Sequence, residues 1–302
     1  MARYVIYGHK GWIGEQVINV LNNLNIFYVL GNSRVDDEES VREELMDNIE
    51  KNGVTNVICL IGRTHGTIDG KEYPTIDYLE QKGKLYDNVR DNLFAPLTLA
   101  FLCKEFKLHL TYMGTGCIFE YDEEHPFGLE ENGFKDGFKE SSLPNFFGSS
   151  YSVVKGFTDR MMRQFSENVL NVRIRMPITS DSSPRNFITK ISTYKKVCSI
   201  PNSMSVLPEL LPIMIDMSQN KYTGTINLCN PGLITHNEIL EMYREYVNKE
   251  FKWENFTLEE QAKILAAGRS NNFMDTTRLQ TLYPNVKHIK EAVKEILIKM
   301  SI

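Results

Sequence analysis

Short apolar runs alternate with longer amphipathic patterns through the first half of the chain, and this alternation constrains the fold most strongly. Tyr4–Tyr7 is an apolar run, Ile13–Leu24 has helical spacing, and Phe27–Leu30 is a second apolar run. The order repeats further on, with an apolar run at 57–61, further strands expected at 108–113 and 172–175, and helical patterns at 38–51, 85–106 and 150–167. Strands that alternate with helices in this way form right-handed crossovers and a parallel sheet. The sequence therefore predicts an α/β fold with a doubly wound parallel sheet.

The pattern changes beyond Pro177, where proline and serine break it into short pieces, including 207–212. A late apolar run follows at Thr225–Leu228, and a helix is expected at Asn237–Val247, preceded by a capping box of Thr235 and Glu238. We therefore expect residues 1–176 to form the sheet domain. Residues 177–302 are expected to form mainly a smaller substrate-binding lobe, with some segments returning to the sheet domain.

Three glycines, Gly8, Gly11 and Gly14, stand between the first predicted strand and the first predicted helix. Glycines there let the backbone turn tightly and approach a pyrophosphate at the helix N-terminus. The alternative is a plain tight turn. We expect a Rossmann-type dinucleotide site, with Trp12 and Ile13 of the same loop beside the cofactor and Trp12 serving for packing rather than chemistry.

Arg34 lies about 20 residues beyond the last glycine, where an acid favours NAD and an arginine suits the 2′-phosphate of NADP. Asn32 and Ser33 supply neutral donors beside it, while Asp36 and Asp37 compete for the guanidinium. The sequence therefore favours NADPH, and a solvated surface arginine is the alternative. Three more cofactor-binding residues are expected after the third apolar run, near the ribose and nicotinamide: Gly62, Arg63 and Thr64.

Tyr151 and Lys155 are four residues apart, so their side chains share one helix face. An ammonium beside a phenol stabilises phenolate, so that the tyrosine can exchange a proton with a carbonyl oxygen. Thr115 stands where the fourth strand ends, and its hydroxyl is expected to bind the same oxygen. Such a spacing also arises by chance, but its place between the fourth and fifth strands favours a catalytic trio of Thr115, Tyr151 and Lys155, in which Tyr151 and Lys155 also contact the cofactor.

Charge and composition exclude several kinds of partner. The net charge of −5 disfavours a nucleic-acid groove, and no run approaches the roughly 18 apolar residues of a membrane span. Five cysteines without a Cys-x-x-Cys pair are typical of a reduced, cytosolic protein without a structural metal site. We therefore expect no nucleic acid, no membrane and no metal ligand.

The glycine loop with Thr115, Tyr151 and Lys155 resembles the extended short-chain dehydrogenases, which include nucleotide-sugar epimerases, dehydratases and reductases. Longer strings resemble the bifunctional UDP-4-keto-6-deoxyglucose 3,5-epimerase/4-reductases of plants and giant viruses: Gly114–Asp122, Arg175–Ile178, Pro184–Lys190, Ile200–Met204, Asn230–Gly232, His236–Ile239 and Arg269–Asn272. This resemblance covers much of the chain. It implies UDP-L-rhamnose synthesis from a UDP-sugar with NADPH, in the cytosol of a cell or infected host cell, by a homodimer formed through helices flanking the sheet.

A 4-ketone acidifies the hydrogens on C3 and C5, so inversion needs a proton carrier on each face of the sugar. Cys117 is two residues past Thr115, and a thiol serves when a cation lowers its pKa. Lys190 is the candidate partner, and the resemblance implies that this pair carries out epimerisation. The alternatives are a buried, inert Cys117 and a solvated Lys190.

The resemblance also implies a substrate-binding set. Arg269, Asn271 and Asn272 are expected at the nucleotide phosphates, since an arginine fork suits a diphosphate, although Arg269 could equally cap the lobe. Asn186 and Phe187 are expected to line the sugar–uracil cleft.

Sugar 4,6-dehydratases of this superfamily carry an Asp-Glu pair just after the catalytic threonine, and here Gly116 and Cys117 stand there. We therefore expect a separate upstream 4,6-dehydratase to supply the 4-keto sugar. Two rival functions stay open: a 4-ketoreductase alone, as in dTDP-4-dehydrorhamnose reductase, and a non-catalytic NADP-binding regulatory subunit, as in the beta subunit of methionine adenosyltransferase. The sequence leaves UDP and dTDP undistinguished.

Overall fold

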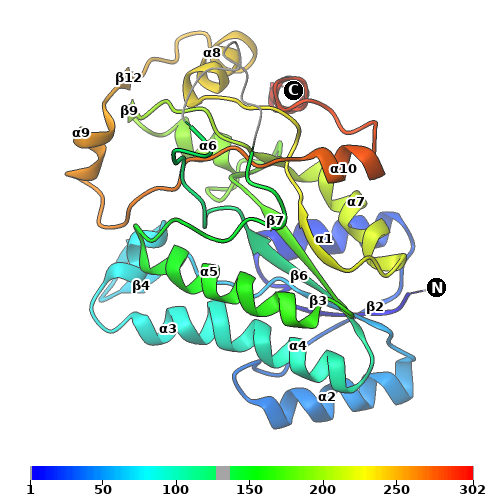
Figure 1. Cartoon of the computed structure of the whole chain (residues 1–302). Coiled ribbons are helices and arrows are strands. Elements are labelled where there is room, and N and C mark those ends of the chain that lie inside the picture. Colours follow the sequence, from blue (N-terminus) through cyan, green and yellow to red (C-terminus); the bar gives the residue numbers. More distant parts are fainter. Residues whose placement is uncertain (1, 127–136, 302) are drawn as a thin grey trace.

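A six-stranded parallel sheet lies at the centre of the computed structural model, which describes residues 2–126 and 137–301 (Figure 1). Its strands are β1 (Tyr4–Tyr7), β2 (Tyr28–Leu30), β3 (Asn56–Cys59), β6 (His109–Thr115), β7 (Val169–Ile174) and β11 (Gly224–Asn227). They run in the order β2-β1-β3-β6-β7-β11, and each neighbouring pair is parallel. This arrangement confirms the predicted α/β fold class.

The strand order reverses between β1 and β3, because the chain moves outward from β1 to β2 and then returns to β3. In open parallel sheets, ligands bind outside the carboxyl ends of the strands at such a point. The loops after β1 and β3 pack directly on each other there: a Cβ on Gly8 would lie 2.7 Å from the backbone carbon of Leu60. The topology therefore places a binding edge beside the glycine loop.

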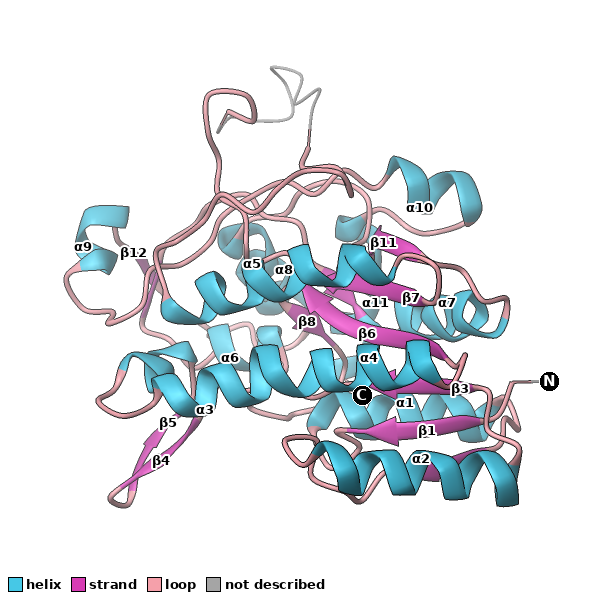
Figure 2. Ribbon diagram, turned by 60° about the horizontal axis from the view of Figure 1, so that its bottom comes forward, coloured by secondary structure: helices cyan, strands magenta, loops and turns pink. Residues whose placement is uncertain are grey.

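Helices cover both faces of the sheet (Figure 2). On one face lie α2 (Glu38–Asn52), α3 (Leu85–Val89), α4 (Ala95–Glu105) and α5 (Ser150–Met162), and on the other α1 (Trp12–Asn23), α7 (Leu207–Gln219) and α10 (Thr277–Leu282). Along β1, Val5 and Tyr7 belong to the first core, whereas Tyr4 and Ile6 belong to the second. Both faces of the strand are buried, which explains why it is a continuous apolar run.

The long helix predicted at 85–106 contains a π-helical turn, η2 (Arg90–Phe94), between α3 and α4. Such turns occur frequently at functional sites. Here the turn carries the buried Asn92, whose side chain accepts from the backbone N–H of Arg63 at 2.8 Å and donates to its carbonyl at 2.9 Å. The turn therefore fixes the loop that follows β3.

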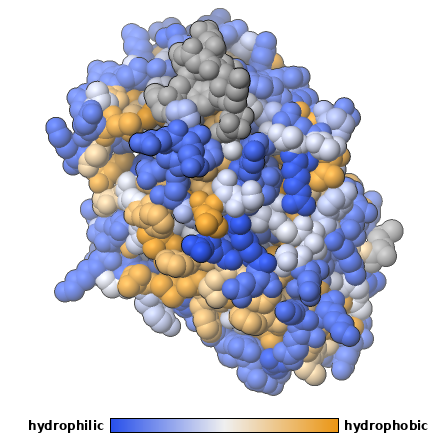
Figure 3. Space-filling model, viewed as in Figure 1, coloured by the Kyte–Doolittle hydropathy of each residue, from blue (hydrophilic) through white to orange (hydrophobic). Residues whose placement is uncertain are grey.

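Exposed apolar side chains gather on α3, η2, α4 and α5. Figure 3 shows this apolar surface over the part of the molecule where Figure 1 places those helices. Its exposed members are Leu85, Tyr86, Val89, Phe94, Phe101 and Phe157. Large exposed apolar patches mark interaction surfaces in soluble proteins.

The second half of the chain builds a third apolar core. The elements that supply it are β8 (Pro177–Ile178), α6 (Phe187–Ile191), β9 (Lys196–Val197), β10 (Ser205–Val206), α8 (His236–Tyr246) and α11 (Ile289–Met300). The shorter pieces elsewhere in the fold are β4 (Gly66–Ile68), β5 (Lys71–Tyr73), η1 (Ile76–Glu80), η4 (Arg163–Phe165), β12 (Glu254–Asn255) and α9 (Leu258–Ala262). The capping box before α8 is confirmed, with both reciprocal bonds between Thr235 and Glu238 present. Three segments beyond residue 176, α7, β11 and α10, pack in the sheet domain instead.

The expectation of broken pieces at 207–212 is wrong, because α7 is a helix of 13 residues. Pro208 occupies its first turn, where a backbone N–H has no intrahelical partner in any case. Pro212 lies inside the helix, but seven buried side chains on α7 offset the hydrogen bond that it removes. Among the described helices, none combines the length and apolarity needed to cross a membrane.

Candidate active site

Thr115, Cys117 and Tyr151 meet at the carboxyl end of β6. The backbone N–H of Cys117 donates to the Thr115 hydroxyl at 3.0 Å, and the Ser152 hydroxyl donates to the Cys117 carbonyl at 2.7 Å. Cys117 packs against the ring of Tyr151 in one small apolar cluster. The strand end and the first turn of α5 thus bring three of the predicted residues together.

The buried side chains of Tyr151 and Lys155 stand on one face of α5, which begins after the N-cap Ser149. Burial raises the pKa of Tyr151, the neighbouring Cys117 raises it further, and a hydrogen bond from Thr115 lowers it. Burial also lowers the pKa of Lys155 to about 8. A tyrosine that holds its proton suits a general acid.

The Lys155 ammonium donates to the hydroxyl of Tyr112 and lies 4.6 Å from the centre of its ring. The sequence analysis missed Tyr112, which lies three residues before Thr115 on β6. The structure thus gives the Lys155 ammonium a buried phenol, that of Tyr112, as its acceptor.

The glycine loop fits a dinucleotide pyrophosphate. A Cβ on Gly14 would lie 2.5 Å from the Gly8 carbonyl oxygen, so this glycine is required by packing, whereas at Gly11 the nearest atom would be 3.4 Å away. Gly11 is the N-cap of α1 and offers no capping side chain, which leaves the first-turn N–H groups for an anion. Trp12 and Ile13 are partly buried against the second core.

Arg34 extends from the loop after β2, and its side chain is 71% exposed. Its guanidinium donates to both oxygens of Asp36, at 3.0 and 2.8 Å, which is the competition that the sequence indicates. The Glu44 carboxylate accepts the backbone N–H groups of Asn32 at 2.7 Å and Ser33 at 3.2 Å, and so holds the loop itself. Arg34 is the cation of this loop that projects into solvent.

The loop 62–64 rests on the π-helical turn. A Cβ on Gly62 would lie 3.3 Å from the Asn92 side-chain oxygen, and the Arg63 guanidinium donates to Asp91 at 2.7 Å. The Thr64 hydroxyl lies 3.2 Å from a ring nitrogen of His65. Sequence reasoning missed Asn92, although Asn88 and Asn92 at four-residue spacing in an apolar helical pattern were a usable signal.

Lys190 lies on α6, half-buried, in a cationic neighbourhood. Burial lowers its pKa, and the positive charges of Arg185 and Arg269 lower it further. Burial with Arg185, Arg63 and Lys190 likewise lowers the pKa of His65 to about 4. The charged groups that act on the Lys190 ammonium are thus cations, whereas Cys117 contacts Thr115, Ser152 and the cluster of Tyr151. Direct pairing of Cys117 with Lys190 stays a prediction.

The side chain of Asn186, which was expected to line the substrate cleft, makes contacts within the protein. Asn186 is fully buried and caps α6: its side-chain oxygen accepts from the N–H of Ile188 at 3.3 Å, and its amide donates to the Thr179 and Asp181 carbonyls at 2.9 and 2.8 Å. Phe187 packs edge-on against His236, with ring centres 5.3 Å apart.

Asn272 is also placed differently from the expectation of direct phosphate contact. It is fully buried, and its amide donates to the carbonyls of Gly116 and Phe119 at 2.9 Å each, so it supports the loop that carries Cys117. Asn271 accepts from the Asn202 amide at 2.8 Å.

Arg269 donates to the Asp77 carboxylate at 2.6 Å, a contact that the sequence analysis missed. Asp77 also accepts from the backbone N–H of Ala267 at 2.8 Å, so it holds the 267–269 segment against η1. Phosphate binding by Arg269 stays a prediction.

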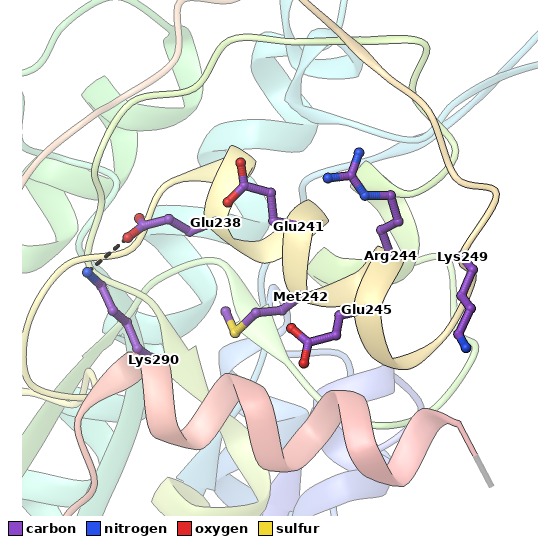
Figure 4. Close-up of a pocket in the computed structure, with 7 residues that line it drawn as sticks. All are labelled: Glu238, Glu241, Met242, Arg244, Glu245, Lys249 and Lys290. Atoms are coloured by element: carbon purple, nitrogen blue, oxygen red, sulfur yellow. Dashed lines mark ion pairs between the residues drawn. The ribbon is translucent and has the colours of Figure 1, made fainter.

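A surface hollow lies on α8 beside α11 (Figure 4), lined by Glu238, Glu241, Met242, Arg244, Glu245, Lys249 and Lys290. Lys290 pairs with Glu238 there at 2.9 Å. None of the predicted site residues lines this hollow, and its charges are of both signs, so it is separate from the cluster around Tyr151.

No family model matches the chain. Protein L780 of Acanthamoeba polyphaga mimivirus is 51% identical over 298 residues, which span 99% of this chain and 98% of that protein. The crystal structure of the L780 UDP-rhamnose synthase covers 99% of both chains with a TM-score of 0.91. Dehydrorhamnose reductase from Bacillus anthracis, in complex with NADP, shares the fold at 15% identity, with a TM-score of 0.77 over 99% of this chain and 100% of that one.

Two kinds of plant enzyme are similar over 96% of the chain. The bifunctional dTDP-4-dehydrorhamnose 3,5-epimerase/reductase of Arabidopsis thaliana is 44% identical over 291 residues, or 90% of its length. A trifunctional enzyme of the same plant, which combines UDP-glucose 4,6-dehydratase with UDP-4-keto-6-deoxy-D-glucose 3,5-epimerase and UDP-4-keto-L-rhamnose reductase, is also 44% identical, and the chain spans 41% of its length. The chain therefore belongs to the UDP-rhamnose synthase family of nucleotide-sugar 3,5-epimerase/4-reductases.

Proposed function

We propose that the protein converts UDP-4-keto-6-deoxy-D-glucose to UDP-L-rhamnose, by 3,5-epimerisation followed by NADPH-dependent reduction of the 4-ketone. The observation that carries this proposal is the meeting of Thr115, Cys117 and Tyr151 at the carboxyl end of β6. A proton donor for the ketone oxygen and a thiol for an adjacent carbon are thereby available in one place. The family relationship supports the same pair of reactions.

In the reduction, Tyr151 gives its proton to the C4 oxygen while the Thr115 hydroxyl binds that oxygen. Lys155 supplies positive charge behind Tyr151 and stabilises the phenolate that is left. When bound, NADPH supplies the hydride for C4.

In the epimerisation, Cys117 and Lys190 carry protons to and from C5 and C3. One group removes the hydrogen next to the ketone, and the other returns a proton from the opposite face, so the carbon inverts with no net change in protons. The lowered pKa of Lys190 supports its role, since a larger fraction of neutral amine is available as a base. The cations that lower it also favour an anionic substrate.

We further propose that the glycine loop holds the pyrophosphate of NADPH and that Arg34, with Asn32 and Ser33, binds its 2′-phosphate. The uncapped start of α1 at Gly11 supports the first assignment. The exposed guanidinium of Arg34 supports the second, because a phosphate can take the place of Asp36 on it. Arg269 is the proposed ligand of the substrate diphosphate.

We propose that a separate 4,6-dehydratase supplies the 4-keto substrate. Gly116 and Cys117 stand where the dehydratases of this superfamily carry their Asp-Glu pair, so this site has no such pair for removing water from the sugar. We place the reaction in the cytosol, where the Cys117 thiol stays reduced.

We propose a homodimer through the apolar surface on α3, η2, α4 and α5. Its exposed side chains include Leu85, Tyr86, Phe101 and Phe157, with exposed fractions from 57 to 68%. A two-fold axis would bury the same patch on both copies. Sedimentation of the wild type and of a Tyr86→Glu, Phe157→Glu variant tests this: a dimer that becomes monomeric supports the surface, and an unchanged mass contradicts it.

The deciding experiment is incubation of the protein with UDP-4-keto-6-deoxyglucose and NADPH, followed by product analysis. UDP-L-rhamnose supports the proposal. Reduction without inversion at C3 and C5 would favour a 4-ketoreductase, and failure to oxidise NADPH with either the UDP- or the dTDP-linked sugar would favour a non-catalytic NADP-binding subunit.

A further inference from the structure

Asp181 joins the glycine loop to the substrate-binding lobe across more than half of the chain. One of its carboxylate oxygens accepts from the indole N–H of Trp12 at 3.0 Å and from the side-chain amide of Gln16 at 3.2 Å. Trp12 and Gln16 are the first and fifth residues of α1, so both donors stand on one face of its first turns. The other carboxylate oxygen accepts from the N–H of Ser183 at 2.9 Å, which fixes the local turn.

The backbone carbonyl of the same residue holds α6. It accepts from the Asn186 amide at 2.8 Å and from the Thr189 hydroxyl at 3.2 Å. Asn186 caps α6, and its own carbonyl accepts the N–H of Lys190 at 2.9 Å. A continuous series of hydrogen bonds therefore leads from Trp12 through Asp181 to the backbone of Lys190.

We propose that Asp181 is a positioning residue through which the glycine loop sets the place of Lys190. A dinucleotide that orders Gly8–Gly14 then also orders α6, so proton transfer at C3 and C5 is fastest when the cofactor site is filled. This inference rests on the proposed function for the identity of the sugar, for the cofactor at the glycine loop and for Lys190 as a proton carrier. The hydrogen-bonded connection concerns the chain alone.

The chemistry of the connection favours a positional role. The Asp181 carboxylate accepts hydrogen bonds from three neutral groups: the indole N–H of Trp12, the side-chain amide of Gln16 and the backbone N–H of Ser183. Directed hydrogen bonds from neutral groups fix an orientation, and the positive end of α1 favours a carboxylate there. Neither Trp12 nor Asp181 needs to touch the sugar for Lys190 to respond.

Hydrogen–deuterium exchange of backbone amides tests the connection without any substrate. In wild type, NADP⁺ should slow exchange both in the glycine-loop peptide and in the peptide carrying α6, the latter by about 2- to 10-fold, the worth of one hydrogen bond. In Asp181→Ala, the glycine loop should still be protected and α6 should not respond. Asp181→Asn keeps an acceptor oxygen and should retain most of the response, and Asp47→Ala, at an exposed carboxylate on α2, should behave as wild type.

The second readout is deuterium uptake at C3 and C5 of UDP-4-keto-6-deoxyglucose in D₂O, with and without NADP⁺. Wild type should be accelerated about 2- to 10-fold by NADP⁺, and Asp181→Ala should lose that acceleration while binding NADP⁺. An α6 response that is equal in wild type and Asp181→Ala would overturn the proposal, as would a wild-type α6 that ignores a bound cofactor. If α6 responds as expected but the sugar takes up no deuterium, the proposed function fails and the positional role of Asp181 stands.

Discussion

The buried guanidinium of Arg173 donates to both oxygens of the Asp159 carboxylate, at 2.8 and 2.7 Å. Asp159 stands one helical turn beyond Lys155 on α5, and Arg173 belongs to β7. The pair therefore anchors the helix that carries Tyr151 and Lys155 to the central sheet. An anchored helix is what the site needs, because proton transfer depends on distances held within a fraction of an ångström.

Asp159→Ala should lower the free energy of unfolding by about 3–5 kcal/mol, because it leaves Arg173 buried without its counter-ion. Urea unfolding followed by circular dichroism measures this. The matched control is Asp47→Ala, which breaks the exposed pair with Lys51 and should cost no more than about 1 kcal/mol. A loss of the same small size in both variants would contradict an anchoring role.

Tyr151→Phe should reduce NADPH oxidation by about 10²–10⁴-fold while leaving NADPH binding intact, because only the phenolic proton donor is lost. Stopped-flow turnover and a separate cofactor titration provide the two measurements. The variant should still take up deuterium at C3 and C5, since that reaction uses other proton carriers. Turnover above a tenth of wild type would move the proton donor to another residue.

Arg34→Ala should weaken NADPH binding by about 10- to 100-fold and hardly change NADH binding, because only NADPH carries the 2′-phosphate. Asp36→Asn frees the Arg34 guanidinium from its partner and should tighten NADPH binding by up to about fivefold. Fluorescence titration with both cofactors distinguishes the two effects. Equal losses for NADPH and NADH in Arg34→Ala would mean that the arginine is structural.

Cys117→Ala and Lys190→Ala should each depress deuterium uptake from D₂O at C3, at C5 or at both, because each removes one proton carrier. Mass spectrometry and NMR of the sugar, incubated with NADP⁺, locate the label. Both variants should still reduce a ketone whose C3 and C5 centres are already inverted, which serves as the control for folding. Deuterium uptake at the wild-type rate in Cys117→Ala would mean that the thiol only fills space in the protein. It would favour an enzyme that reduces the 4-ketone without epimerising the sugar.

The reduction rate should fall as the pH rises through about 8, because burial lowers the pKa of Lys155 to that value and the neutral amine no longer stabilises the Tyr151 phenolate. The sign is fixed: the ammonium is present below pH 8 and is lost above it. A profile of the NADPH oxidation rate between pH 6 and 10 measures this decrease and its midpoint. In Lys155→Arg the guanidinium stays protonated, so the rate should fall at a higher pH. A midpoint at the same pH as in wild type would mean that a different group causes the decrease.

The sequence predicts those parts of the site that depend on local spacing. Gly8, Gly11 and Gly14 follow a strand and begin a helix, as predicted. The side chains of Tyr151 and Lys155, four residues apart, lie on one face of α5. Which way an amide points is not a local property. Asn186 could be read from the sequence as a ligand, yet its buried amide is used up by the cap of α6.

Contacts between distant segments are also outside the reach of sequence patterns. Arg269 and Asp77 are 192 residues apart, and Trp12 and Asp181 are 169 apart, so neither pair leaves a periodic signal. The helix α7 was misjudged for a different reason. Its two prolines indicate a break, but the apolar face that it buries against α1 and the sheet outweighs their cost.

The pairing of β11 with β7 has a consequence for biosynthesis. About 50 residues separate the end of β7 from the start of β11, and ribosomes add about 5–20 residues each second. For roughly 3–10 seconds the emerging chain therefore carries the completed strand β7 with no partner on its outer edge. An open strand edge is a template for pairing with another chain. During translation, β7 is thus the segment at which two nascent copies on neighbouring ribosomes would join wrongly.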